Sequence, residues 1–250
     1  MADQRQRTGG GDSREGLLTE TFVQLADSLI DEFDIIDLLT LLADRSTRLL
    51  EVDAAGILLA DASGNLRVMA ASNDQVRLLE LFQLQNQQGP CLEAYATKAP
   101  VIESDLAAAV GRWPLFAKEA TGAGYQSVAA FPLRLREVVI GALNLFRVAP
   151  GGMVGDDMAL AQALADVASI AILQDQAIRA AEVRAGELQH ALDSRIAIEQ
   201  AKGMVAERAQ VEMADAFKQL RNYARSHNRL LAVVAREIVE GTLPLDAVTE

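Results

Sequence analysis

Basic residues gather at helical spacing near the C-terminal end of an otherwise acidic chain. The 250 residues carry a formal charge of −12, yet the segment from Arg195 to Arg236 holds eight Lys and Arg against four Asp and Glu. A local excess of this kind indicates a separate partner for the C-terminal part, and nucleic acid is one candidate because Lys and Arg neutralise phosphates. The alternative is a solvated helix face of mixed charge, because such faces are common.

A helix over residues 212–225 would place these charges on one edge. At about 100° per residue, Lys218, Arg221 and Arg225 fall within an arc of about 60°. Apolar residues occupy the neighbouring arc, which predicts that Phe217 lies in the core. Tyr223 lies at the margin of that arc, where a core role and a contact with a partner are equally expected.

Residues that could support other chemistry are few. Cys91 is the single cysteine, which excludes an intrachain disulfide and favours a reducing, cytoplasmic location. We expect Cys91 to be packed in a loop, with a thiolate that acts as a redox sensor or an attachment point as the alternative. His190 and His227 are the only histidines, and no metal-ligand spacing, glycine-rich phosphate loop or Ser/His/Asp arrangement occurs. The expectation is a protein that is not an enzyme and holds no metal or cofactor.

Neither a membrane span nor a secretory signal is expected. No apolar run approaches the roughly 20 residues that a membrane helix needs. The first residues, MADQRQRTGGGDSREG, lack the apolar centre of a signal peptide. Residues 1–16 are interpreted as a disordered tail.

The first two thirds of the chain predict an α+β domain. Residues 17–50 have the periodicity of one or two amphipathic helices, and residues 54–72 and 127–147 each indicate a β-hairpin. From Asp157 to Arg208 there is no proline, which predicts a long connector helix. Such a helix needs a partner for its apolar positions, so we expect a homodimer. The alternative is that the connector lies on the sheet domain.

Three helices are predicted to follow as a bundle. They cover residues 188–208, 212–225 and 229–240, with Gly241 as the stop. Residues 242–250 are interpreted as a tail.

Segments of this sequence resemble two known families. The stretches GPCLEAYATKAPVIESD (89–105) and FPLRLREVVIGALNLFR (131–147) resemble a GAF domain, a small-molecule sensor fold. The stretches SRIAIEQAKGMV (194–205) and DAFKQLRNYA (215–224) resemble an ANTAR domain, a three-helix RNA-binding module of bacterial antiterminators. The resemblance implies a GAF-like antiparallel sheet flanked by helices over 17–175, a connector helix over 157–187 and an ANTAR-like bundle over 188–241.

The resemblance also implies a mechanism. ANTAR dimers bind paired RNA hairpins in a nascent transcript and prevent a terminator stem from forming, while the sensor domain controls access to the RNA-binding part. A small-molecule ligand is therefore expected in the GAF domain, and hairpin RNA and a second copy of the chain are the expected partners. The expected RNA contacts are Arg195, Lys202, Lys218, Arg221, Tyr223, Arg225 and Arg229.

Two features depart from the ANTAR pattern. Leu230, Ala232 and Val233 stand in the third helix where charged residues are common, and AERAQVEM lacks the usual glycine between the first two helices. The apolar third helix motivates an alternative function, a signalling adaptor that acts through protein–protein contacts of the bundle.

Overall fold

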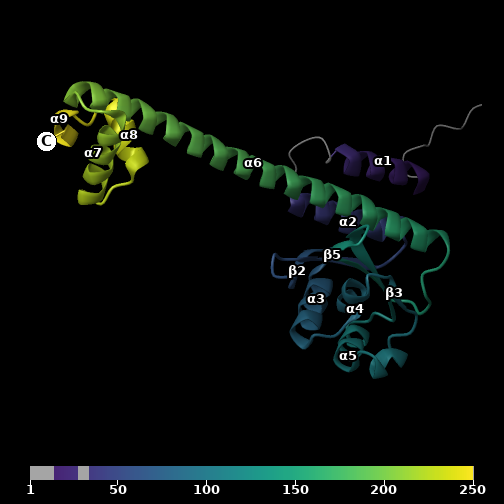
Figure 1. Cartoon of the computed structure of the whole chain (residues 1–250). Coiled ribbons are helices and arrows are strands. Elements are labelled where there is room, and N and C mark those ends of the chain that lie inside the picture. The colour runs from purple at the N-terminus through teal and green to yellow at the C-terminus, as the bar shows by residue number, and fades with distance from the viewer. Residues whose placement is uncertain (1–13, 28–33, 250) are drawn as a thin grey trace, which may run out of the picture. The chain divides into compact units, whose positions relative to one another are not determined.

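The computed structural model describes residues 14–27 and 34–249. The chain divides into two compact units, Met1–Gln176 and Ala177–Glu250, which we call the sheet unit and the helical unit. The predicted α+β layout is confirmed: a sheet flanked by helices, then a long helix and a C-terminal bundle (Figure 1).

The sheet unit is built on five antiparallel strands in the order β2-β1-β5-β4-β3. The strands are β1 (Ala54–Ala60), β2 (Leu66–Ala71), β3 (Val101–Glu103), β4 (Ser127–Leu135) and β5 (Val138–Arg147). Both predicted hairpins are present, as β1–β2 and β4–β5. The first turns at Asp61, whose carboxylate accepts from the backbone N–H of Ser63 and Asn65, while Gly64 takes a positive φ of 82°.

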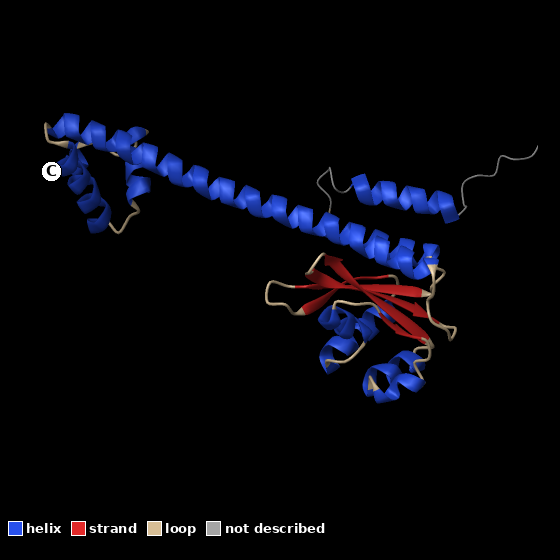
Figure 2. Cartoon of the chain, turned by 45° about the vertical axis from the view of Figure 1, so that its right-hand side comes forward, coloured by secondary structure: helices blue, strands red, loops and turns tan. Residues whose placement is uncertain are grey.

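Helices cover both faces of this sheet (Figure 2). They are α1 (Arg14–Asp27), α2 (Ile35–Leu49), α3 (Asp74–Asn86), α4 (Pro90–Thr97), the 3₁₀ turn η1 (Ala108–Gly111), α5 (Pro114–Gly122) and α6 (Asp156–Ala209). Side-chain caps start two of them: Asp34 accepts from the N–H of Ile36, and Asn73 accepts from that of Val76. The residues 28–33, which fall inside the first predicted helical region, lie outside the described residues.

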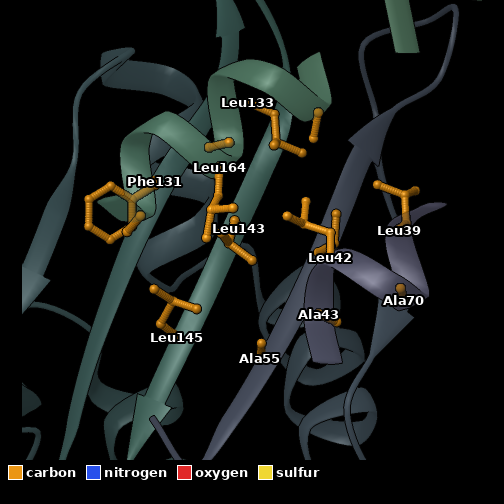
Figure 3. Close-up of a cluster of buried hydrophobic side chains, with 14 of the residues drawn as sticks. Leu39, Leu42, Ala43, Ala55, Ala70, Phe131, Leu133, Leu143, Leu145 and Leu164 are labelled. Carbon is orange, nitrogen blue, oxygen red and sulfur yellow. The ribbon is translucent and has the colours of Figure 1, made fainter. Parts of the chain in front are cut away.

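The sheet separates two apolar layers. On one face, Leu42 of α2 and Leu164 of α6 pack with Phe131 of β4 and Leu143 of β5 (Figure 3). On the other face, α3, α4 and α5 form a second buried cluster, which includes the single tryptophan, Trp113. Because both faces are covered, β1 and β4 are buried over most of their length.

The helical unit contains the end of α6, α7 (Met213–Ser226), α8 (Leu231–Val239) and α9 (Asp246–Thr249). Its core joins small and branched residues from each helix: Ala197, Ala201, Val205, Ala216, Leu220, Ala224, Val234, Ala235, Ile238 and Val248.

The structure corrects the predictions for two terminal segments. The segment 242–250, predicted to be a tail, contains the helix α9 (Asp246–Thr249), which buries Val248 against the core of the helical unit. At the other end α1 begins at Arg14, inside the segment predicted to be a disordered tail, and residues 1–13 lie outside the described residues.

The predicted connector is one continuous helix of 54 residues, α6. Its early positions Ala161, Leu164, Ala168 and Ile172 are buried in the sheet unit. Farther along, a series of apolar side chains is exposed: Ile178, Val183, Leu188, Leu192 and Ile196. Among the described helices, none combines the length and apolar composition that a membrane span needs.

Candidate functional site

The predicted basic edge lies on the solvent side of α7. Ala216, Leu220 and Ala224 bury the opposite side of this helix in the core of the helical unit. Lys218, Arg221 and Arg225 are all exposed. We call these three residues the α7 basic edge. The amphipathic pattern of α7 therefore exposes three cationic side chains to solvent along one helix, as the sequence indicates.

The cations of this edge are not equally available. The Lys218 ammonium lies 2.8 Å from the Asp215 carboxylate, one helical turn earlier, and this hydrogen bond raises the pKa of Lys218. Within the described residues, Arg221 and Arg225 make no ion pair. A phosphate would meet two arginines that pair with no carboxylate in the described part of the chain.

The remaining predicted contacts fall on α6 and at the start of α8. Lys202 is half-buried and forms an ion pair with Glu199, whereas Arg195 is exposed and has no ion pair within the described part of the chain. Arg229 is bound by Glu237 of α8, and that hydrogen bond raises the pKa of the Arg229 guanidinium. The Arg229 ion pair therefore joins the α7–α8 turn to α8, whereas the Lys202 ion pair lies within α6. An exposed cation that the prediction left out is Arg236, on the outer side of α8.

An aromatic pair at the end of α7 joins Tyr223 to a residue not predicted as a contact. The Tyr223 and His227 rings are stacked, with centroids 4.0 Å apart and planes 26° from parallel. Tyr223 packs against the core of the helical unit, while His227 is exposed. The spacing of four residues on a helix was the available signal for this contact.

The side chain of Phe217 is less buried than predicted. It is half-buried and does not belong to the buried cluster formed by the described residues of the helical unit. Its position on α7 explains this, because Phe217 lies one helical turn before Arg221, at the edge of the apolar arc. Large apolar side chains also reach solvent nearby, since Leu230 is 75% exposed and Val233 is 42% exposed.

The turn between α6 and α7 lacks the expected glycine, and another residue takes the conformation that glycine usually adopts. Gln210 takes the left-handed conformation, with φ at 53°, directly after the end of α6. This is the conformation for which glycine is preferred at the end of a helix. The turn is therefore preserved with a residue that adopts it at some cost.

The interior of the sheet unit contains a second polar group of interest. Glu80 of α3 is fully buried, and its carboxylate accepts hydrogen bonds from the side-chain amides of Asn144 on β5, at 2.8 and 3.0 Å, and of Gln83. Burial raises the pKa of Glu80 to about 8, although both hydrogen bonds act to lower it. We call Glu80, Gln83 and Asn144 the interior polar cluster.

Two glycines make room for this cluster. A Cβ on Gly56 would clash with the Glu80 carboxylate, and a Cβ on Gly89 would clash with the Gln83 amide. Gly56 on β1 pairs with Asn144 on β5, so the cluster lies over the middle of the sheet. Cys91 is buried beside it, but in α4 and not in the predicted loop, and its pKa is raised by burial and by the nearby Glu80. Among the described residues, no three His, Cys, Asp or Glu side chains are placed to hold a metal ion.

Comparison with known families accounts for both units. The GAF domain family model matches residues 34–173, more than half of the chain. The ANTAR domain family model matches residues 186–239. No curated protein matches the chain in sequence.

Solved structures support the fold of the sheet unit. The GAF domain of a phosphoenolpyruvate-protein phosphotransferase from Coxiella burnetii is 16% identical with a TM-score of 0.51, and the match covers 68% of this chain and 99% of that chain. The phycoerythrobilin-bound GAF domain of a cyanobacterial phytochrome is 18% identical with a TM-score of 0.51, over 68% of this chain and 99% of that chain. Free methionine-R-sulfoxide reductase from Neisseria meningitidis, in complex with its substrate, is 18% identical with a TM-score of 0.50, over 68% and 96%. At these identities the likeness shows the fold alone.

Proposed function

This chain belongs to the GAF domain family and carries an ANTAR domain behind its sensor, and from this premise we propose that it is a non-enzymatic, RNA-binding regulator of transcription antitermination. The observation that carries the proposal is the α7 basic edge, in which Arg221 and Arg225 are exposed without an ion pair in the described residues. Guanidinium groups bind phosphate oxygens and also stack on unpaired bases of RNA loops.

The acidic remainder of the chain is compatible with this role. Outside the segment from Arg195 to Arg236, where Lys and Arg are in excess, acidic residues outnumber basic ones. A locally basic surface on an acidic protein attracts RNA at one place while the rest of the molecule repels it. Specific hairpin binding with little nonspecific binding is the expected result.

The exposed series on α6 supports dimerisation as part of the same proposal. Ile178, Leu188 and Leu192 are 49%, 72% and 52% exposed, and Ala181 and Ala185 lie between them at heptad-like spacing. An apolar row of this length on a single helix is stabilised by a second copy of the helix. A dimer would present two α7 basic edges and so engage two hairpins of one transcript.

Charge reversal tests the RNA-binding edge. We expect Arg221→Glu/Arg225→Glu to abolish binding to a two-hairpin RNA, measured by fluorescence anisotropy on the full-length protein. Arg77→Glu on α3 is the matched control, because Arg77 is exposed in the sheet unit. Equal RNA binding by the double variant and the control would show that the α7 basic edge does not bind RNA.

A substitution in α6 tests the dimer. Leu188→Lys/Leu192→Lys places two cations in the exposed apolar row, and sedimentation is expected to show a monomer that binds two-hairpin RNA more weakly. A wild-type protein that sediments as a monomer at micromolar concentration would contradict the pairing of α6 helices.

Exposed apolar residues at the start of α8 favour a second candidate, a signalling adaptor. Leu230 and Val233 form an exposed apolar surface next to the bundle core, and surfaces of this kind mark protein–protein contacts. Leu230→Ser/Val233→Ser separates the two functions. Loss of a captured protein partner with unchanged RNA binding would favour the adaptor, whereas tight RNA binding without any protein partner would count against it.

A further inference from the structure

The stacked rings of Tyr223 and His227 form a surface that the bundle core does not require. Tyr223 is half-buried against the core, so the position of its ring is fixed. His227 covers that ring at 4.0 Å, is exposed and lies outside the residues that pack against the core. A flat ring with one side supported and the other side open to solvent is the arrangement on which nucleobases stack.

The His227 ring is held in place before any ligand arrives. Its Nδ1 lies 2.9 Å from the Tyr223 carbonyl and 3.1 Å from the Ser226 hydroxyl. Since a carbonyl only accepts hydrogen bonds, Nδ1 is the donor in the bond to Tyr223. Asn228, the next residue, takes a positive φ of 53°. Little conformational freedom remains to be lost when a base stacks here.

Charge around the pair favours a nucleotide over an apolar partner. Arg229 lies close enough to Tyr223 for the two to interact electrostatically, and Glu237 fixes its guanidinium. Arg225 lies between the two residues in the sequence and is exposed on another side of α7. A base stacked on His227 would therefore have the Arg229 cation nearby for its own phosphate.

We infer that the Tyr223–His227 pair is a stacking platform for one unpaired base of the hairpin loop. The inference rests on the proposed RNA-binding function and adds the element that distinguishes a loop from a duplex. Arginines of the α7 basic edge bind phosphates in any RNA, whereas a ring platform binds only a base that has left its helix.

The test combines a protein variant with changes in the RNA. The probe is a two-hairpin RNA selected from a pool with randomised loops on the full-length wild-type protein, together with versions in which each loop nucleotide in turn is abasic. We expect His227→Ala to weaken binding about ten-fold without changing the dependence of binding on salt. In the wild-type protein, one abasic position in the loop should weaken RNA binding to the same extent. The same abasic position should not weaken RNA binding by His227→Ala any further. His227→Phe keeps a ring and should restore binding.

Two controls separate stacking from other roles. Arg221→Gln should lower the salt slope by about one, and its effect should add to that of every abasic position. Unchanged helix content by circular dichroism shows that His227→Ala is folded. The assignment of the stacking platform is wrong if His227→Ala binds RNA as tightly as wild type. It is also wrong if the loss of affinity in His227→Ala adds to the loss caused by every abasic position in the loop. Absence of binding by the wild-type protein to any selected hairpin would overturn the RNA-binding function and the platform with it.

Discussion

The buried Glu80 carboxyl makes the stability of the sheet unit depend on pH. Its pKa is about 8 in the folded chain against an ordinary value of 4.5, so folded Glu80 keeps its proton over a pH range in which the unfolded chain has lost it. The unfolded state then binds fewer protons, and the free energy of unfolding falls as pH rises. This contribution is fully present below pH 4.5 and is lost by about pH 8.

The variant Glu80→Gln removes the titration and keeps the shape of the side chain. The difference in unfolding free energy between Glu80→Gln and wild type should rise by about 1.4 kcal/mol per pH unit and reach on the order of 5 kcal/mol across the window. The amides of Gln83 and Asn144 must reorient, because both donate to Glu80. The Asn144 Oδ1, which has no hydrogen-bond partner within the described residues, is then available to accept from the new amide. At pH 4.5 we expect the variant to be no more stable than wild type.

The single tryptophan provides the assay. Trp113 is 3% exposed in the same apolar layer as α3, so urea unfolding followed by its fluorescence reports on the sheet unit. Cys91 interacts electrostatically with Glu80, and burial raises the pKa of its thiol, so it stays protonated in this range. Glu119→Gln, at an exposed carboxylate on α5, is the matched control. A stability difference between Glu80→Gln and wild type that stays constant from pH 4.5 to 8 would refute the reasoning.

Three further substitutions test the packing directly. Gly56→Ala forces a Cβ into the Glu80 carboxylate and should lower the stability of the sheet unit by about 1–3 kcal/mol, measured by Trp113 fluorescence; unchanged stability would show that Glu80 has room to move. Gln210→Gly relieves a left-handed residue after α6 and should raise the thermal stability of the helical unit by about 1 kcal/mol, seen by circular dichroism, whereas a loss would indicate that Gln210 contributes contacts of its own. Leu220→Ala empties a fully buried position and should cost about 2–5 kcal/mol; a cost below 1 kcal/mol would mean that the core of the helical unit closes around the gap.

The sequence predicts the elements that have a strong period. In the two hairpins, the strand residues are apolar or alternate between apolar and polar, and turn residues lie between the strands. The helix α6 extends from Asp156 to Ala209 without a proline. In both cases the signal is local, because a few neighbouring residues determine the backbone. The α7 basic edge is equally local, since the helical period alone places Lys218, Arg221 and Arg225 together.

Features that depend on distant residues could not be predicted in this way. Glu80 has the appearance of an exposed helical carboxylate, and only the pairing of Gly56 with Asn144 in the sheet creates the space and the donors that bury it. The α9 helix was missed because four residues carry too little periodicity, and the burial of Val248 appears only with the folded core. The ion pairs of Lys202 and Lys218 had a visible spacing of three residues, but that of Arg229 with Glu237 depends on the turn between α7 and α8.

The measurement that bears most directly on RNA binding compares a tandem-hairpin RNA with a scrambled RNA across a salt series, using the purified full-length protein. Preferential binding of the tandem hairpin is expected, with a steep loss of affinity as salt rises, because the contacting arginines displace counterions from phosphates. Equal binding of both RNAs, or binding that does not depend on salt, would contradict recognition of hairpin RNA by the α7 basic edge.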